Sequence, residues 1–160
     1  MKQRHDGSAA PADVRHVAMD LLANREHSTV ELRRKLNDRG FDSAAVEDAL
    51  AALAREGLLS DRRFTESYVN SRTQKGCGPL RIRAELRERG IGSELIAEFL
   101  DERDRSWHAV ARAAHRKRFG ETPPRDFRER AKQARFLQQR GFTVEQIRHI
   151  LQQDDWDQAE

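Results

Sequence analysis

Apolar residues recur along most of the chain at the 3.6-residue spacing of an α-helix. No segment shows the strict alternation of apolar and polar residues that is typical of a half-buried β-strand. Three stripes are especially regular: Val46, Ala49, Leu50 and Leu53; Ile96, Phe99 and Leu100; and Ile147, Ile150 and Leu151. Each stripe gives one amphipathic helix. The pattern therefore predicts an all-α protein.

The same short block occurs three times, centred on Gly40, Gly90 and Gly141, at spacings of 50 and 51 residues. In each copy a leucine stands four residues before the glycine, an arginine one residue before it, and Phe or Ile one residue after it. These residues are Leu36, Leu86 and Leu137; Arg39, Arg89 and Arg140; and Phe41, Ile91 and Phe142. Repetition at a fixed period indicates an array of similar supersecondary units.

Each block is typical of one helix ending and the next beginning. A glycine in the left-handed conformation ends a helix, and the flanking Leu36 and Phe41 match the apolar contact of a Schellman motif. The residues that follow are plausible N-caps, namely Asp42 or Ser43 in the first copy, Ser93 in the second and Thr143 in the third.

The helix that enters each glycine also has a marked start. The pairs Ser28–Glu31 and Asp126–Glu129 have the spacing of capping boxes, Gly78–Pro79 offers a small cap with proline at the first helical position, and Ser60 or Asp61 opens a further helix. Each copy has another amphipathic segment upstream. We therefore expect a disordered tail over 1–12 and three three-helix repeats over 13–61, 62–106 and 107–160, which together form an elongated, curved module.

Charge is distributed unevenly along the 160 residues, whose total net charge is +3 with an isoelectric point near 9.4. The first repeat is acidic, at −3, whereas residues 62–90 have a net charge of +5 and residues 112–140 of +7. A single arginine is more often a solvated helix residue than a contact, but the two basic stretches together favour an anionic partner, either DNA or an acidic protein surface.

The aromatic residues do not predict a platform for stacking bases. Four of the ten fall on core positions (Phe41, Phe64, Phe99 and Phe142), and we interpret the others as core as well: Tyr68, Trp107, Phe119, Phe127, Phe136 and Trp156.

Signatures of catalysis and of metal binding are missing. The six histidines form no HExxH motif and are interpreted as surface residues, and the single cysteine, Cys77, supplies no zinc set and is interpreted as a small filler. The glycine-rich stretch 75–79 lacks the P-loop pattern. Its helix start at Gly78 could touch a phosphate, although capping explains the residues equally well. We expect no cofactor, no metal and no enzymatic activity.

The amino terminus has no apolar core of a secretion signal, and no apolar run approaches the roughly 20 residues of a membrane span. A single cysteine forms no internal disulfide and suits a reducing compartment. These features predict a cytoplasmic protein that does not associate with a membrane.

The run EGLLSDRRFTESYVNSR…KGCGPLRIRAELRERGI, residues 56–91, resembles the signature region of the RecX family of bacterial regulatory proteins. The flanking repeats and their order extend the resemblance over residues 13–157, with one minor departure, Cys77 within what is often a plain Lys-Gly-Pro stretch.

The resemblance implies three tandem three-helix units that bind the RecA recombinase along the groove of its filament on single-stranded DNA. RecX-like proteins block filament growth or promote disassembly, so that the ATPase, strand exchange and SOS coprotease activities of RecA fall. The family has no universal catalytic or cofactor residue. We expect a monomer that also contacts single-stranded DNA, with duplex DNA as a further candidate, without sequence preference. The acidic first repeat would face a basic patch of RecA.

Six residues match the family's central motif: Arg72, Lys75, Gly78, Pro79, Arg81 and Arg83. The interaction surface expected from this motif and the basic stretches comprises Arg72, Lys75, Arg81, Arg83, Arg87, Arg112, Arg116, Lys117 and Arg118. Reversal of Arg81 and Arg83 to glutamate is then expected to abolish inhibition of RecA and to leave helicity intact.

Two other classes of function stay open at this point. Three-helix units also occur in helix-turn-helix proteins, and a sequence-specific DNA-binding protein would prefer one duplex site independently of RecA. A nuclease or other hydrolase of nucleic acid would need metal-dependent turnover, which the missing ligand set disfavours.

Overall fold

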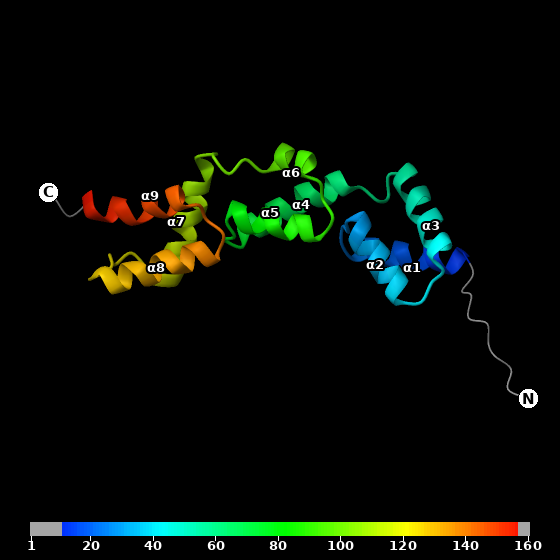
Figure 1. Ribbon diagram of the computed structural model, residues 1–160, viewed down its shortest axis with the longest axis horizontal. Coiled ribbons are helices and arrows are strands. Elements are labelled where there is room, and N and C mark those ends of the chain that lie inside the picture. Colours follow the sequence, from blue (N-terminus) through cyan, green and yellow to red (C-terminus); the bar gives the residue numbers. More distant parts are fainter. Residues whose placement is uncertain (1–10, 157–160) are drawn as a thin grey trace, which may run out of the picture. The chain divides into compact units, whose positions relative to one another are not determined.

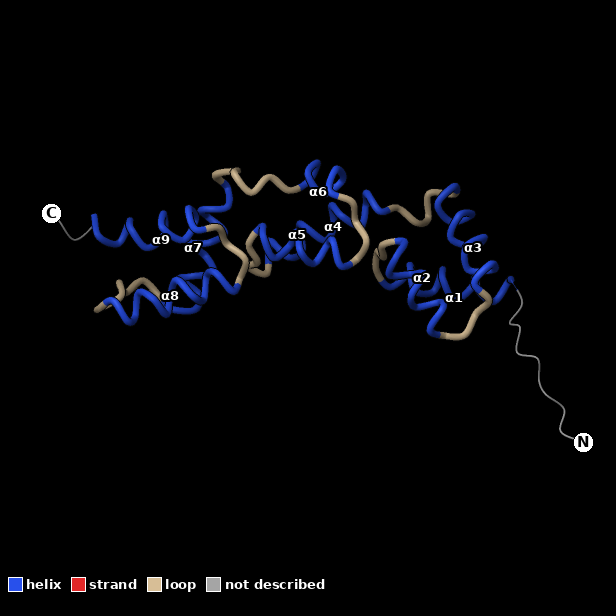
Figure 2. Tube along the Cα trace, viewed as in Figure 1, coloured by secondary structure: helices blue, strands red, loops and turns tan. Residues whose placement is uncertain are grey.

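The computed structural model describes residues 11–156, with side chains for residues 12–152, and this part of the chain consists of helices and connecting loops (Figures 1 and 2). No strand occurs in it. The helices are α1 (Pro11–Asn24), α2 (Thr29–Asp38), α3 (Ser43–Arg55), α4 (Asp61–Gln74), α5 (Pro79–Glu88), α6 (Ser93–Phe99), α7 (Ser106–Phe119), α8 (Phe127–Gln139) and α9 (Val144–Trp156). The prediction of an all-α protein is confirmed.

The described residues divide into two compact units. The first comprises residues 11–67 and 89–91, and the second residues 68–88 and 92–156. Helix α1 begins at Pro11, two residues before the predicted start of the first repeat. The rest of the predicted tail, residues 1–10, lies outside the described residues. The repeat boundaries at 61 and 106 and the curved form of the module stay predictions.

Helices α1, α2 and α3 enclose the core of the first unit (Figure 1). The stripe predicted for α3 is buried there, since Val46, Leu50 and Leu53 are at most 3% exposed. The other buried apolar residues of this core are Val14, Ala18, Leu32, Leu36 and Leu59. Complete removal of these side chains from water is the main stabilising contribution, about 1.5–3 kcal/mol for each Val or Leu.

In the second unit, α7, α8 and α9 pack on one another around Trp107, Ala111, Leu137, Ile150 and Leu151 (Figure 1). Helices α5 and α6 bury Ile82, Leu86 and Ile96. Of the stripe predicted for α6, Ile96 and Leu100 are buried and Phe99 is half-buried. Of the stripe predicted for α9, Ile150 and Leu151 are buried and Ile147 is half-buried.

The predicted helix ends are confirmed in their conformation. Gly40, Gly90 and Gly141 have φ of 85°, 78° and 96°. At the first and third of these, the N–H of Phe41 donates to the carbonyl of Leu36 at 3.4 Å, and that of Phe142 to Leu137 at 3.1 Å, which is the 6→1 bond of a Schellman motif.

Most of the predicted caps are also present. Ser28 and Glu31 form a capping box, Asp126 accepts from the N–H of Glu129, and Asp42, not Ser43, caps α3. The prediction for Ser93 is wrong, because Gly92 is the N-cap and Ser93 is the first helical residue of α6. The cap stands two residues after the glycine in each copy, at Asp42, Gly92 and Thr143, and Ser93 is one position beyond it.

The aromatic assignments hold in part. Five of the aromatic side chains expected in the core are only half-buried: Phe41, Tyr68, Phe99, Phe119 and Phe136. Trp107, Phe64 and Phe142 are buried, and Phe119 meets Phe136 edge to face with centroids 5.3 Å apart. Phe127, expected in the core, is 85% exposed at the start of α8. The side chain of Trp156 lies outside the described residues.

Candidate functional site

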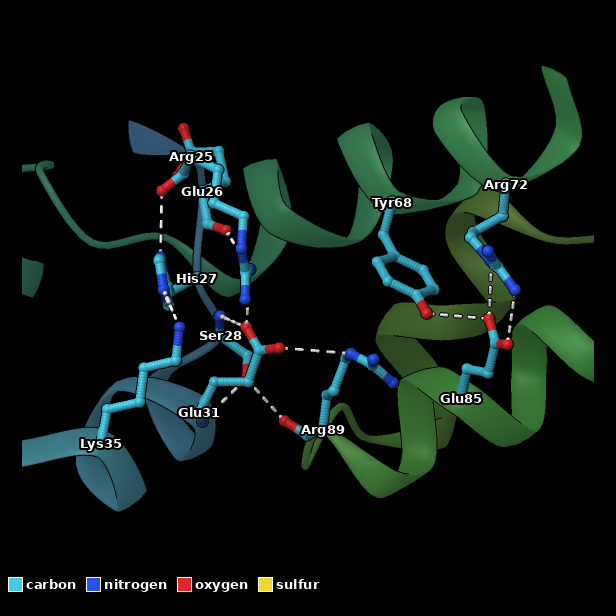
Figure 3. A network of polar contacts seen from close by, with 10 residues as sticks. All are labelled: Arg25, Glu26, His27, Ser28, Glu31, Lys35, Tyr68, Arg72, Glu85 and Arg89. Carbon is cyan, nitrogen blue, oxygen red and sulfur yellow. Dashed lines mark hydrogen bonds and ion pairs between the residues drawn. The ribbon is translucent and has the colours of Figure 1, made fainter. Parts of the chain in front are cut away.

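The carboxylate of Glu85 on α5 lies beside Tyr68 and the motif residue Arg72, both on α4 (Figure 3). Its carboxylate accepts from the hydroxyl of Tyr68 at 2.8 Å and from Nε and Nη2 of Arg72 at 2.9 and 2.7 Å. Arg81, one turn before Glu85, adds a contact of 3.2 Å. The carboxylate therefore ties the second half of α4 to α5.

These hydrogen bonds stabilise the ionised forms of both Glu85 and Arg72. Burial on its own would raise the pKa of Glu85, but the hydrogen bonds from Arg72, Tyr68 and Arg81 outweigh it and lower that pKa below its ordinary value. The same hydrogen bond with Glu85 raises the pKa of Arg72. The side chain of Arg72 is 21% exposed, so this expected contact residue acts within the fold, as a link between two helices.

Arg83 also has a partner inside the unit. Its guanidinium pairs with the carboxylate of Glu102, and the carbonyl of Glu102 accepts from the side-chain amide of Gln146 at 2.9 Å. Arg83 thus belongs to a chain of contacts that joins α5, the loop after α6, and α9.

The helix start at Gly78 is occupied by the protein itself. The N–H of Gly78 donates to the carbonyl of Arg140 at 2.7 Å, and that of Leu80 to the carbonyl of Gly141 at 2.9 Å. A phosphate therefore does not find these groups free, and the phosphate interpretation of this helix start is wrong. Cys77 beside it is buried as a free thiol, in agreement with its interpretation as a filler.

The remaining predicted cations lie apart from Glu85. Lys75, Lys117 and Arg118 surround one cavity of about 600 Å³ together with Arg140, a residue that the sequence analysis did not select. Arg116 pairs with Glu121 at 3.3 Å on the exposed surface. Arg87 and Arg112 are exposed on α5 and α7. Two groups thus stand out among the expected residues: Arg72, Arg81 and Arg83 form ion pairs with Glu85 or Glu102, and Lys75, Lys117 and Arg118 line the cavity beside α7. Arg87, Arg112 and Arg116 belong to neither group.

A second polar network lies in the first unit and includes the second arginine of the repeat (Figure 3). Glu31 contacts Arg25 and Arg89, each at 3.2 Å, and Ser28 Oγ donates to the carbonyl of Arg89 at 2.7 Å. Burial opposes ionisation of Glu31, but hydrogen bonds from Arg25 and from the N–H of Ser28 lower its pKa. Residue 89 is thereby fixed on the first turn of α2.

His27 stands at the edge of this network and contradicts the surface interpretation of the histidines. It is 1% exposed, and its Nδ1 lies 3.0 Å from the carbonyl of Arg25 while its Nε2 lies 2.9 Å from Lys35 Nζ. An ammonium group only donates, so Nε2 accepts and Nδ1 carries the proton. Burial, with the charges of Arg25 and Lys35, lowers the pKa of His27 although the bond to the Arg25 carbonyl opposes this.

The other described histidines do not form a reactive centre. His115 is also buried, and its Nε2 lies 2.7 Å from Oε1 of Gln133. His108 stacks on His149 with ring centroids 3.9 Å apart, and partial burial followed by the charge of His149 lowers the pKa of His108. Within the described part of the chain, no cluster of three or more His, Cys, Asp or Glu residues is arranged to hold a metal ion.

Comparison with known proteins agrees with this architecture. Three family models match in order: the first three-helix domain of RecX over residues 15–53, the second over 60–100 and the third over 108–151. The chain belongs to the RecX family. Two similar relatives are named Regulatory protein RecX, one from Halorhodospira halophila, 48% identical with 89% of each chain covered, and one from Pseudomonas fluorescens strain SBW25, 49% identical with 90% of this chain and 93% of that protein covered.

Solved RecX structures share the fold. The crystal structure of RecX from Lactobacillus salivarius matches with a TM-score of 0.74 at 19% identity, over 91% of this chain and 97% of that one. A second crystal structure of regulatory protein RecX matches with a TM-score of 0.75 at 24% identity, over 89% and 73%. In the described residues, no helix has the length and apolar character needed to cross a membrane.

Proposed function

We propose that this RecX-family chain binds the RecA recombinase and its filament on single-stranded DNA, and thereby lowers the ATPase, strand-exchange and coprotease activities of RecA. It acts by binding and catalyses no reaction. The proposal rests on membership of the family and on a cationic surface in the second unit. We expect it to act as a monomer in the cytoplasm.

The observation that carries the proposal is the group formed by Lys75, Lys117 and Arg118. Lys117 and Arg118 lie on α7 and Lys75 directly follows α4, and the three side chains surround one opening. None of them forms an ion pair with a described carboxylate, whereas Arg72, Arg81 and Arg83 all do. Cations without an ion-pair partner are available to an acidic protein face or to DNA phosphates, although the guanidinium of Arg118 also lies 5.1 Å from the ring centroid of Phe119.

Because Arg81 and Arg83 form ion pairs within the fold, their substitution is not a clean test of the binding surface. Reversal of Arg81 and Arg83 to glutamate would place new carboxylates beside Glu85 and Glu102, so that a loss of inhibition would also reflect damage to the fold. Reversal of Lys117 and Arg118 breaks no ion pair to a described residue. These two positions are therefore the better test.

The experiment is a titration of the single-strand-dependent ATPase of the cognate RecA with this chain, well below equimolar. Strong inhibition at a low ratio that persists when excess single-stranded DNA is added supports action on the filament. Inhibition that excess DNA abolishes indicates sequestration of DNA. No inhibition, combined with nanomolar preference for one duplex sequence, would favour the helix-turn-helix alternative.

A further inference from the structure

The cavity beside α7 combines an apolar floor with a cationic rim. Its floor is formed by Ala109, Val110 and Ala113 on one face of α7 and by Phe136 near the end of α8. A volume of about 600 Å³ is large enough for one or two bulky side chains. All of these residues belong to the second unit.

The rim has one sign of charge. Lys75, Lys117, Arg118 and Arg140 line the cavity, and none of its described lining residues is Asp or Glu. Arg140 adds a specific feature, because its Nε is buried without a hydrogen-bond partner while its guanidinium lies 5.6 Å from the centroid of Phe136. A buried donor without a partner is costly, and an incoming acceptor would satisfy it.

The floor distinguishes between two kinds of anionic ligand. A nucleobase inserted here would lose hydrogen bonds at its polar edge, because the floor offers aliphatic and aromatic groups. The hydroxyl of Thr73 at the side already donates to the carbonyl of Val69, which leaves the exposed Gln74 as the other uncharged polar side chain among the described lining residues. An aliphatic or aromatic amino-acid side chain loses no hydrogen bond in the same space. Carboxylates next to this side chain in a peptide would lie close to the cationic side chains of the rim.

We propose that this cavity binds an acidic peptide segment of a partner protein, with a bulky apolar side chain on the floor and flanking carboxylates on Lys75, Lys117, Arg118 and Arg140. The proposal goes beyond the proposed function, since it assigns a binding site and the chemistry of its ligand whichever protein supplies the segment. It is tested without RecA, so its failure and that of the proposed function are separate results.

The test measures fluorescence anisotropy of the full chain with a labelled hexapeptide in which Leu-Phe is flanked on each side by two glutamates. We expect saturable binding that weakens about tenfold, or about 1.4 kcal/mol, in Ala113→Trp and in the double variant Lys117→Glu with Arg118→Glu. Ala113 is exposed, so the larger side chain fills the cavity without entering the core. Ala97→Trp on α6 and the double variant Arg128→Glu with Arg135→Glu on α8 lie at exposed positions outside the cavity. They are the matched controls and should bind as the unaltered chain does.

Three outcomes would overturn the proposal. Equal binding of a peptide with Ser-Ser in place of Leu-Phe would reduce the site to a diffuse charged surface. A thymidine hexanucleotide that binds more tightly than the peptide, and is blocked by Ala113→Trp, would assign the cavity to single-stranded DNA. A chain shortened to end at Gln152 that binds the peptide more tightly would make the protein's own acidic segment after Gln152 the occupant. Circular dichroism confirms that each variant is folded.

Discussion

The main-chain N–H of Gly78 donates a 2.7 Å hydrogen bond to the carbonyl oxygen of Arg140, 62 residues further along the chain. A second bond, from Leu80 to Gly141, follows two residues later, in the first turn of α5. The end of α8 thus caps the start of α5 with main-chain atoms. A β-carbon on Gly78 would lie 2.5 Å from the carbonyl oxygen of Gly141, so only a residue without a side chain fits there.

The first prediction concerns this contact. Gly78→Ala should lower the free energy of unfolding by about 1–3 kcal/mol. The main chain at Gly141 and Phe142 would have to move to make room for the methyl group, and main-chain atoms move little. Urea unfolding followed by circular dichroism measures it. Gly92→Ala is the matched control, because Gly92 also directly precedes a helix but a β-carbon there meets nothing within 4 Å. It should cost at most about 1 kcal/mol, from the replacement of an N-cap glycine. Equal loss in both variants would contradict the packing argument.

The second prediction concerns Glu85. Glu85→Gln should destabilise the protein by about 1–3 kcal/mol at neutral pH, because Arg72 loses its charged partner in a partly buried place. The pKa of Glu85 is lowered in the folded state, so its contribution is complete above the ordinary value of 4.5 and is lost as the pH falls through the folded pKa. Urea unfolding of both proteins should therefore show a difference that narrows on acidification. A difference that is constant with pH would argue against the ion pair.

The third prediction concerns His27, whose pKa is lowered below its ordinary value of 6.5. Below this pH His27 is protonated in the unfolded chain but stays neutral in the folded chain until the pH reaches its lowered pKa. The free energy of unfolding should therefore fall as the pH drops from about 6.5. His27→Asn should be less stable at about pH 8 but should show a shallower fall between about pH 7 and pH 5.5. His16→Asn, on the exposed surface of α1, should keep the steep fall.

The fourth prediction concerns the cationic group at α7. Lys117→Glu combined with Arg118→Glu should raise the concentration needed to inhibit the RecA ATPase about tenfold, equivalent to about 1.4 kcal/mol. Arg128→Glu combined with Arg135→Glu changes the net charge equally on the exposed side of α8, away from the cavity. If both pairs weaken inhibition equally, net charge and not this surface determines binding.

Local features of the fold were predictable from sequence because they depend on neighbouring residues. Each of these features depends on residues only a few positions apart: the left-handed glycines, the capping box at Ser28 and the apolar stripe of α3. What the repeat could not indicate is that its three glycines differ. A β-carbon at Gly40 would meet nothing, whereas at Gly90 it would overlap Val30 and at Gly141 it would overlap Arg81. Gly90 packs on α2 and Gly141 packs on α5, in each case the second helix of the repeat before it. Gly40 belongs to the first of the three repeats and has no such neighbour.

The positive charge of the candidate site was predictable from the sequence, but the ion pairs that its arginines form across helices were not. The sequence indicated that Arg72, Arg81, Lys117 and Arg118 belong to basic stretches. It did not indicate that Glu85, 13 residues after Arg72, would pair with it, because that contact depends on how α4 and α5 pack. The contact of Arg81 with Glu85 is instead an i,i+4 pair within α5. Arg140 was counted in its basic stretch but not selected, although its place before the repeated glycine puts it beside both the cavity and α5.

The contact between α8 and α5 is made by peptide groups, and peptide groups are the same in every protein. Gly78 and Gly141 take part because they lack a side chain, so the contact places no demand on the chemistry of the residues around it. Charged side chains of these helices outside the ion pairs of Arg81 and Arg83 can therefore change, and with them the binding partners, while the geometry between the helices is preserved.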